Sequence, residues 1–228
     1  MDTGTHRRGA ALGTPGEGIP DYARGSGPNI IKAARSDAED CRRCDLYREA
    51  THLVFGEGPA DAAVMLVGEQ PGDKEDLAAR PFVGPAGHLL DECLGEAGLD
   101  RNLCYLTNAV KHFKHTLKGK KRLHSRPNTG EVRACAFWLK TEIAIVRPRL
   151  IVALGATAVS SLLGPAARVT RMRGTIVQKD EQSVLITIHP SYLLRLRGHS
   201  GAREEMDRFI ADLKLAIPFQ RRKADEAS

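Results

Sequence analysis

Four polar turns in the sequence each follow a short apolar run. They are Gly68-Glu69-Gln70-Pro71-Gly72, Thr107-Asn108, Gly155-Ala156 and His189-Pro190-Ser191. When buried strands run parallel, their carboxyl ends share one edge of the sheet, and ligands bind just outside that edge. Glutamate and histidine at neighbouring strand ends can bind charge and transfer protons. We therefore expect the four turns to converge on one pocket, with Glu69 beside His189.

The elements that must position these turns alternate between strand and helix patterns. Strands are predicted at residues 63–67, 103–109, 150–154 and 184–188. Helices are predicted over residues 86–97, with Gly98 as the stop, from Asn128 to Pro148, and in a C-terminal segment that buries Met206, Phe209, Ile210 and Leu213. Such alternation predicts an α/β fold, a single three-layer domain whose mostly parallel four-stranded sheet is flanked by helices.

The chain of 228 residues is long enough for one substantial core. Residues 1–36 are rich in Gly, Pro, Arg and Ala without periodicity, which predicts a disordered leader. The domain is expected over residues 37–219, followed by a flexible tail at 220–228. No long apolar run or signal-peptide pattern is present, so we expect no membrane contact and a cytoplasmic protein.

The chain carries a net charge of +6, and a segment from Lys111 to Arg126 contains no acidic residue. The basic residues of this segment are Lys111, Lys114, Lys118, Lys120, Lys121, Arg122 and Arg126. Charge alone fits nucleic-acid contact and a solvated, flexible loop equally well. From its position among these basic residues, we expect His124 to contact phosphate or to have no function.

Five cysteines in a cytoplasmic chain indicate metal binding rather than disulfides. The Cys-x2-Cys pair Cys41 and Cys44 can reach one metal centre, and Cys135 is a candidate third ligand. Cys93 lies on the apolar face of a predicted helix and Cys104 in a predicted strand, which favours core positions. A histidine is the natural fourth ligand, and the residues leave His112 and His115 open.

Together these motifs resemble the uracil-DNA glycosylase superfamily, and its iron–sulfur branch, from Cys41 to the C-terminal helix. Family-four members of that branch have Ala where this chain has Gln70, and Cys where Val110-Lys111 is followed by His112. A Lys/Arg-rich insert ending in a histidine, here His124, is a third departure. All three departures resemble the family-X uracil-DNA glycosylases, which bond covalently to the abasic site that they create.

The resemblance implies a uracil-DNA glycosylase fold and activity, and a function for each motif. A [4Fe–4S] cluster would be held by Cys41, Cys44, His112 and Cys135. Phe82, in a Gly/Pro loop that already suits stacking on a planar base, would stack on uracil, and Asn108 would read its polar edge. His189 would donate to the departing base, Glu69 would face the sugar, and His124 would attack the anomeric carbon. The remaining substrate contacts are assigned to Gly68, Gln70, Gly72 and Ser191, and the DNA-backbone contacts to Lys120, Lys121, Arg122 and Arg195.

The expected partner is uracil-containing DNA, single strands preferred, bound by a monomer. Two other readings stay open at this point. One is a conventional hydrolytic glycosylase that releases the abasic site. The other is a non-catalytic iron–sulfur protein that binds nucleic acid through the Lys111–Arg126 segment.

Overall fold

The computed structural model of the chain describes residue 20 and residues 25–220. Most of the predicted leader and all but one residue of the predicted tail lie outside these residues. Five strands form the central sheet in the order β2-β1-β5-β7-β6. Their bounds are β1 Val64–Gly68, β2 Cys104–Asn108, β5 Leu150–Leu154, β6 Thr175–Lys179 and β7 Gln182–Thr187.

The first four strands in that order are parallel, and β6 pairs antiparallel with β7. The predicted α/β class with a mostly parallel sheet is confirmed, but the predicted number of four strands was wrong. The missed strand, β6, lies at the edge of the sheet, and four of its five residues are exposed. An exposed edge strand does not need the apolar run by which the other four were recognised.

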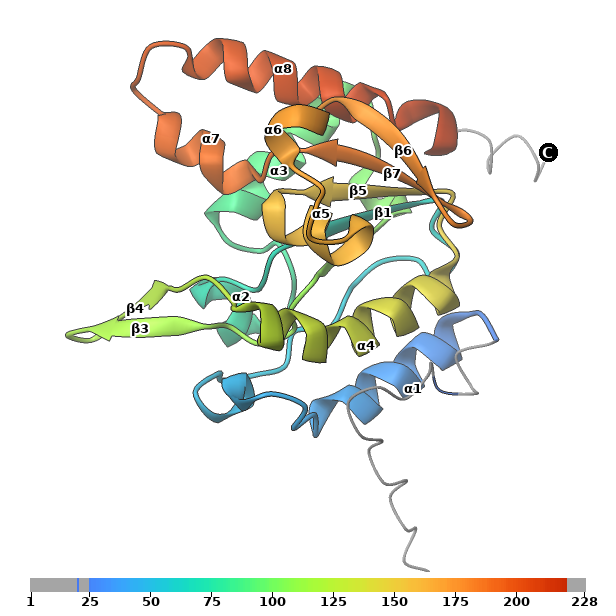
Figure 1. Cartoon of the computed structure of the whole chain (residues 1–228), viewed down its shortest axis with the longest axis vertical. Helices are drawn as coiled ribbons and strands as arrows, with labels where there is room; N and C mark the ends of the chain where they lie inside the picture. Colours follow the sequence, from blue (N-terminus) through green and yellow to red (C-terminus); the bar gives the residue numbers. More distant parts are fainter. Residues whose placement is uncertain (1–19, 21–24, 221–228) are drawn as a thin grey trace, which may run out of the picture.

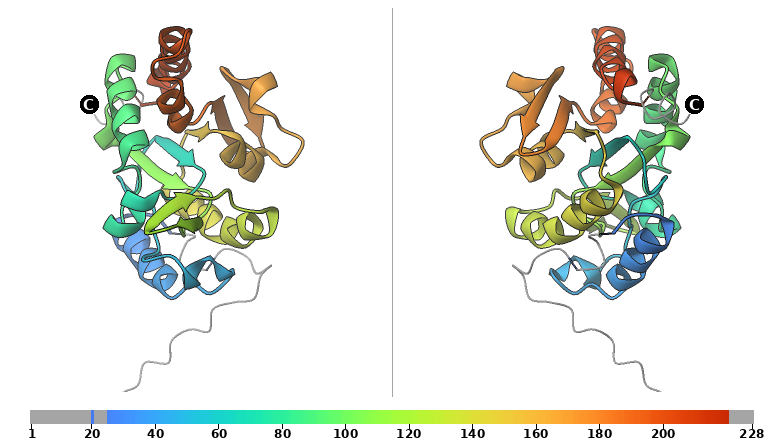
Figure 2. Two further views of the ribbon diagram at one scale, coloured as in Figure 1. Left: turned by 90° about the vertical axis from the view of Figure 1, so that its left-hand side faces the viewer. Right: turned by 90° about the vertical axis from the view of Figure 1, so that its right-hand side faces the viewer.

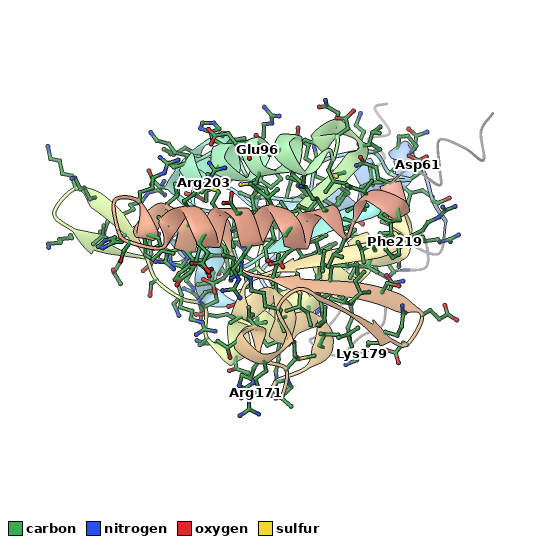
Figure 3. All side chains as sticks on the ribbon, turned by 90° about the horizontal axis from the view of Figure 1, so that it is seen from above. Asp61, Glu96, Arg171, Lys179, Arg203 and Phe219 are labelled. Carbon is green, nitrogen blue, oxygen red and sulfur yellow. The ribbon has the colours of Figure 1, made fainter. Side chains whose placement is uncertain are left out.

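Helices cover both faces of the sheet, which makes the predicted three layers (Figures 1 and 2). One face packs on α3 (Pro85–Ala97), α7 (Pro190–Leu196) and α8 (Ala202–Lys214). The other packs on α4 (Thr129–Val146) and α5 (Ala156–Leu163). Seen from above, α8 lies across the molecule beside α3 (Figure 3). The strands contribute alternate residues to the two faces, so the sheet is buried on both sides.

The three predicted helices are present. The first begins at Pro85 and ends at Gly98, whose φ of 82° is the left-handed conformation that glycine adopts easily. The second begins at Asn128, whose side chain accepts a hydrogen bond from the backbone N–H of Glu131, and the carboxylate of Glu131 in turn accepts from the Asn128 backbone. This capping box satisfies helical N–H groups that have no partner inside the helix. No helix within residues 25–220 is long and apolar enough to cross a membrane.

A further helix, α1 (Pro28–Glu39), begins within the segment predicted to be disordered and continues past its end at residue 36. The leader boundary at residue 36 was therefore wrong. The helix packs on α4 by burying Ala34 and Ala38 near Trp138. Since alanine carries this contact, the apolar periodicity of the segment is weak, which explains the error. At the other end, the Gln220 side chain bonds the backbone of Asp100, so the ordered fold includes the first residue of the predicted tail.

The basic segment forms an antiparallel hairpin of β3 (His115–Lys118) and β4 (Lys121–His124) rather than a flexible loop. The hairpin projects from the side of the molecule at which β5 and β7 end (Figure 1). Its root lies near the short helix α2 (Asp73–Ala78). The remaining short elements are η2 (Asp45–Arg48), η3 (Arg101–Leu103) and α6 (Val169–Met172).

Candidate active site

A cavity of about 1340 Å³ opens at the carboxyl ends of the parallel strands. It contains nine of the predicted site residues, namely Glu69, Gln70, Gly72, Phe82, Asn108, His124, His189, Ser191 and Arg195. Four other predicted site residues do not line the cavity, namely Gly68, Lys120, Lys121 and Arg122. The strand-end turns therefore converge as expected, and the hairpin contributes His124 from outside the sheet.

Glu69 follows β1 and holds its carboxylate between the hairpin and α5. Its Oε1 lies 3.2 Å from His124 Nε2, and its Oε2 lies 3.8 Å from Arg126 Nε and accepts a hydrogen bond from the Thr157 hydroxyl. Burial opposes ionisation, but the hydrogen bonds from His124 and Thr157 and the charge of Arg126 outweigh it and lower the pKa of Glu69. A carboxylate that stays ionised can stabilise positive charge that develops on a substrate or on His124.

His189 caps the N-terminus of α7 with its own ring. The backbone N–H of Ser191 donates to His189 Nδ1 over 3.2 Å, and the Ser191 hydroxyl lies 2.8 Å from the same nitrogen. Burial lowers the pKa of His189 to about 4, so the ring is neutral at neutral pH. With Nδ1 accepting a hydrogen bond, the single ring proton is on Nε2. His189 can therefore donate a hydrogen bond to a ligand in the cavity without carrying charge.

Phe82 and Asn108 lie on one wall of the cavity and pack closely over Gly68. Phe82 stacks on His189 with ring centroids 6.4 Å apart and an interplanar angle of 27°. A Cβ at Gly68 would collide with the Asn108 amide and come within 2.9 Å of the Phe82 ring. Phe82 has a positive φ of 56°, an unfavourable conformation for an aromatic residue that surrounding packing must maintain. A flat ring and an amide on one wall can hold a planar heterocycle.

A buried ion pair beneath Asn108 was missed by the sequence reasoning. Lys111 and Glu142 are fully buried, and Lys111 Nζ lies 2.5 Å from Glu142 Oε2. The same ammonium group donates to the Thr107 hydroxyl and to the backbone carbonyl of Asn108, each over 2.7 Å. Lys111 was counted in the basic segment because it precedes other lysines. The acidic residue that indicates burial, Glu142, lies 31 residues further along the chain and could not be paired with it by pattern.

Gln70 uses its amide to join the two ends of the hairpin. Its Nε2 donates to the backbone carbonyls of Lys114 (3.0 Å) and Ser125 (3.1 Å), and its Oε1 accepts from the Lys114 N–H (3.1 Å). The Gln70 side chain is thus fully engaged by main-chain groups on both sides of the hairpin root.

Ion pairs also fix the hairpin to the body of the protein. Arg122 pairs with Asp73 (2.7 Å) and with the fully buried Asp76 (2.6 Å), and Lys114 pairs with Glu131 (2.9 Å). Lys111, Lys114 and Arg122 therefore pair with acidic groups of the protein, and Arg126 lies near Glu69. The exposed cations are Lys118, Lys120, Lys121 and Arg126.

The cysteines divide as predicted into core residues and candidate ligands. Cys93 and Cys104 are buried in the main core, where burial raises the pKa of Cys93 to about 11 and that of Cys104 to about 12. Neutral thiols of this kind behave as small apolar side chains. Cys44 and Cys135 lie together beside Leu46 and Val110.

The four candidate cluster ligands come from segments that meet beside α4. The Trp138 indole N–H donates to Cys41 Sγ (3.2 Å), and the Lys111 backbone N–H lies 3.3 Å from Cys135 Sγ. The buried Nδ1 of His112 has no hydrogen-bond partner among the described residues. N–H groups aimed at sulfur and an unpartnered imidazole nitrogen suit thiolate and histidine ligation. Within residues 25–220, no group of three or more His, Cys, Asp or Glu residues lies close enough together to hold a metal ion.

Comparisons with known proteins identify the family of this chain. The family model described as the uracil DNA glycosylase superfamily matches residues 55–214. A type-4 uracil-DNA glycosylase of Thermotoga maritima is 40% identical over 176 residues, covering 76% of this chain and 88% of that protein. A type-4 enzyme of Pyrobaculum aerophilum is 37% identical over 171 residues, with 70% and 84% covered. A type-5 uracil-DNA glycosylase of the same organism is 34% identical over 184 residues, with 73% and 77% covered.

Proposed function

The chain belongs to the uracil DNA glycosylase superfamily and is a uracil-DNA glycosylase, and we propose that it retains its abasic product by a covalent bond to His124. The observation that carries the proposal is the position of His124. It is half-exposed, lines the cavity, and lies 3.2 Å from a carboxylate that stays ionised.

Excision begins with a uracil nucleotide rotated out of its strand into the cavity, at a cost of a few kcal/mol. Phe82 stacks on the base and the Asn108 amide reads its polar edge, held from below by the Lys111 bond to the Asn108 backbone. As the N-glycosidic bond breaks, its electron pair moves onto the uracil ring. The neutral His189 donates from Nε2 to that developing anion, and the Glu69 carboxylate stabilises the positive sugar.

Capture follows at the same carbon. A lone pair of the neutral His124 ring forms the new bond to C1′ as uracil leaves with the electron pair of the old one. The ring then carries a positive charge, which the ionised Glu69 carboxylate stabilises until the remaining N–H proton is lost to solvent and a neutral substituted imidazole is left. Glu69 thus stabilises positive charge on the sugar during excision and on the His124 ring during capture. Its carboxylate contacts the hairpin and lines the cavity, as both roles require.

The type-4 relatives favour a second candidate, a hydrolytic glycosylase in which water takes the place of His124. The two are separated by incubating the protein with a labelled, uracil-containing single-stranded oligonucleotide, boiling it in detergent and running a denaturing gel. A retarded, uracil-dependent band supports capture. Free oligonucleotide that breaks under alkali supports hydrolysis, and intact oligonucleotide contradicts both.

Duplex DNA in the same gel tests the proposed preference for single strands, and sedimentation tests the proposed monomer.

The His124→Ser variant sharpens this test. We expect it to release uracil but to lose the retarded band. His115→Ser is the matched control, because His115 lies opposite His124 in the hairpin register. The control should keep the band, and a band of full strength in His124→Ser would remove His124 as the nucleophile.

We further propose that Cys41, Cys44, His112 and Cys135 hold a [4Fe–4S] cluster. When bound, the cluster supplies covalent ties between the N-terminal segment, the segment after β2 and α4, and excision requires no electron from it. The unpartnered His112 Nδ1 supports the assignment. Replacing His112 by Ala should lower the iron content and the visible absorbance of the purified protein. His115→Ala shows which of the two histidines is the ligand. If His112→Ala keeps its iron and His115→Ala loses it, His115 is the ligand and the assignment is reversed.

A further inference from the structure

The turn after β5 is the one strand-end turn to which the proposed function assigns no role. Gly155 and Ala156 line the cavity, and the next residue, Thr157, is buried. The Thr157 hydroxyl donates a hydrogen bond to Oε2 of Glu69. Thr157 is not among the described residues that line the cavity, so an effect of Thr157 on the substrate must pass through the Glu69 carboxylate.

The backbone of this turn holds Thr157 in place. Gly155 has a positive φ of 88°, which favours glycine, and its N–H donates to the Thr187 carbonyl over 2.9 Å. The chain leaves β5 through this glycine and enters α5, which buries Ala158 and Val159 completely in the core. The Thr157 hydroxyl is therefore carried by a packed helix and reaches the carboxylate from a fixed position.

The two oxygens of the Glu69 carboxylate have different partners. Oε1 lies 3.2 Å from His124 Nε2, on the side of the hairpin. Oε2 accepts from the Thr157 hydroxyl on the side of α5 and lies 3.8 Å from Arg126 Nε. The Arg126 side chain is 68% exposed, so water screens its charge, whereas the Thr157 contact is buried and keeps its strength. Thr157 therefore decides where Oε2 points.

From this geometry we propose that Thr157 is a positioning residue for excision and capture. Its hydroxyl holds Oε2, so that the carboxylate presents Oε1 to the sugar and to His124. The same hydrogen bond favours the ionised carboxylate, because the charged form accepts it more strongly than the neutral form does. The inference rests on the role proposed for Glu69, and it does not require His124 to form a covalent bond.

The charged and titratable groups that face Glu69 are His124 on β4, Arg126 after the hairpin and His189 at the start of α7. Burial raises the pKa of Glu69, and the contacts from His124, Thr157 and Arg126 together lower it by more. Removing the Thr157 hydroxyl should therefore raise the pKa of Glu69. Since excision uses the ionised carboxylate, its rate falls on the acid limb of the pH profile, and this limb should move to higher pH.

The test compares proteins that all carry His124→Ser, so that no imidazole of residue 124 titrates beside the carboxylate. Uracil release from a saturating single-stranded oligonucleotide is measured under single-turnover conditions between about pH 5 and pH 8. Thr157→Val keeps the volume but loses the hydroxyl. It should release uracil about 10-fold more slowly at neutral pH, with its acid limb at higher pH. Thr157→Ser keeps the donor and should restore both the rate and the limb.

Ser161→Ala is the matched control. Ser161 lies one turn further along α5, and its hydroxyl donates to the Thr157 carbonyl rather than to Glu69. This variant should keep the rate and the pH profile of its parent. Thermal unfolding of each variant checks the fold, and Thr157→Ser separates the hydrogen bond from the packing of the methyl group if Thr157→Val is unstable.

The outcomes separate this inference from the proposed capture. If the wild-type protein gives no retarded band but Thr157→Val shifts the acid limb, capture fails and the role of Thr157 stands. If Thr157→Val keeps the acid limb of its parent, or if Thr157→Ser is as impaired as Thr157→Val, the role of Thr157 is overturned. A slower rate with an unchanged acid limb also overturns it, because packing alone would give that result.

Discussion

The sheet edge and the β3–β4 hairpin contribute to one cavity but are built in different ways. Glu69, Asn108 and His189 extend from strands that are buried on both faces, and backbone bonds tie the turn after β1 to the segment after β2. His124 lies on a hairpin with mostly exposed residues. That hairpin is fixed by the Gln70 amide and by the Arg122 and Lys114 ion pairs.

The difference separates two steps of the proposed chemistry. Excision needs groups that are already in place when charge develops, and a close-packed sheet edge supplies them. Capture needs one nucleophile brought to the same carbon, and a small number of polar contacts does this. The sheet edge and the hairpin should therefore fail independently, and the following changes test that independence in order of decreasing effect.

The largest effect is expected at the sheet edge, from His189→Ala. Loss of the neutral Nε2 donor should slow uracil release by about 10²–10³-fold, the usual effect of removing one such donor. The fraction of excised sites that become crosslinked should stay unchanged, because the hairpin is intact. Both quantities come from one single-turnover time course that scores released uracil and the retarded band.

Ser191→Ala is the control for this change. It removes the hydroxyl but keeps the backbone N–H that holds His189 Nδ1, so uracil release should fall by less than about 10-fold. A loss of that small size in His189→Ala itself would mean that other groups stabilise the departing base.

The hairpin should respond in the opposite way to Arg122→Met. This change keeps the apolar stem and leaves the buried Asp76 without its cation, at a cost of about 2 kcal/mol once the partial exposure of Arg122 is allowed for. We expect crosslinking to fall by roughly 30-fold while uracil release stays within about 3-fold. Lys121→Met removes a neighbouring exposed charge and should leave the crosslinked fraction near that of the wild type.

The sequence also predicts that Arg122 and Lys121 both contact the DNA backbone. The salt dependence of DNA affinity in Arg122→Met and Lys121→Met tests this prediction. Each lost phosphate contact flattens the salt slope. A flatter slope in Lys121→Met alone would assign Arg122 to the protein and Lys121 to DNA. Equal crosslinking in the two variants would contradict the role of the Arg122 ion pairs.

The same contrast explains what the sequence could predict. The strand-end turns could be found because apolar runs and capping residues are local signals, and parallel strands bring such turns together. The hairpin could not be found from the sequence, because Thr116, Leu117 and Leu123 are exposed and present no apolar face. Its contacts with Asp76 and Gln70 join residues more than 40 positions apart. For the same reason Lys111 looked like a solvated cation until Glu142 was placed beside it.

Gln70→Ala should give a smaller effect than Arg122→Met and of the same kind. It removes three hydrogen bonds to the backbone of Lys114 and Ser125, and some of those groups can turn to water. We expect crosslinking to fall by about 10-fold, corresponding to a net loss of about 1.4 kcal/mol. Gln178→Ala, on the exposed edge strand β6, is the control. If uracil release falls as much as crosslinking, Gln70 also acts in excision, as its predicted substrate contact requires.

The smallest effect concerns pH and distinguishes the buried sheet edge from the exposed hairpin. Burial lowers the pKa of His189 from 6.5 to about 4, so between those values the unfolded chain binds a proton that the folded protein does not. The free energy of unfolding then rises with pH across this window and is lost as pH falls through it. Urea unfolding at pH 7 and at about pH 5.7 should show this loss, and His189→Ala should reduce it by about 1 kcal/mol. Equal pH dependence in the two proteins would mean that water reaches the His189 ring, and that burial does not keep this ring neutral.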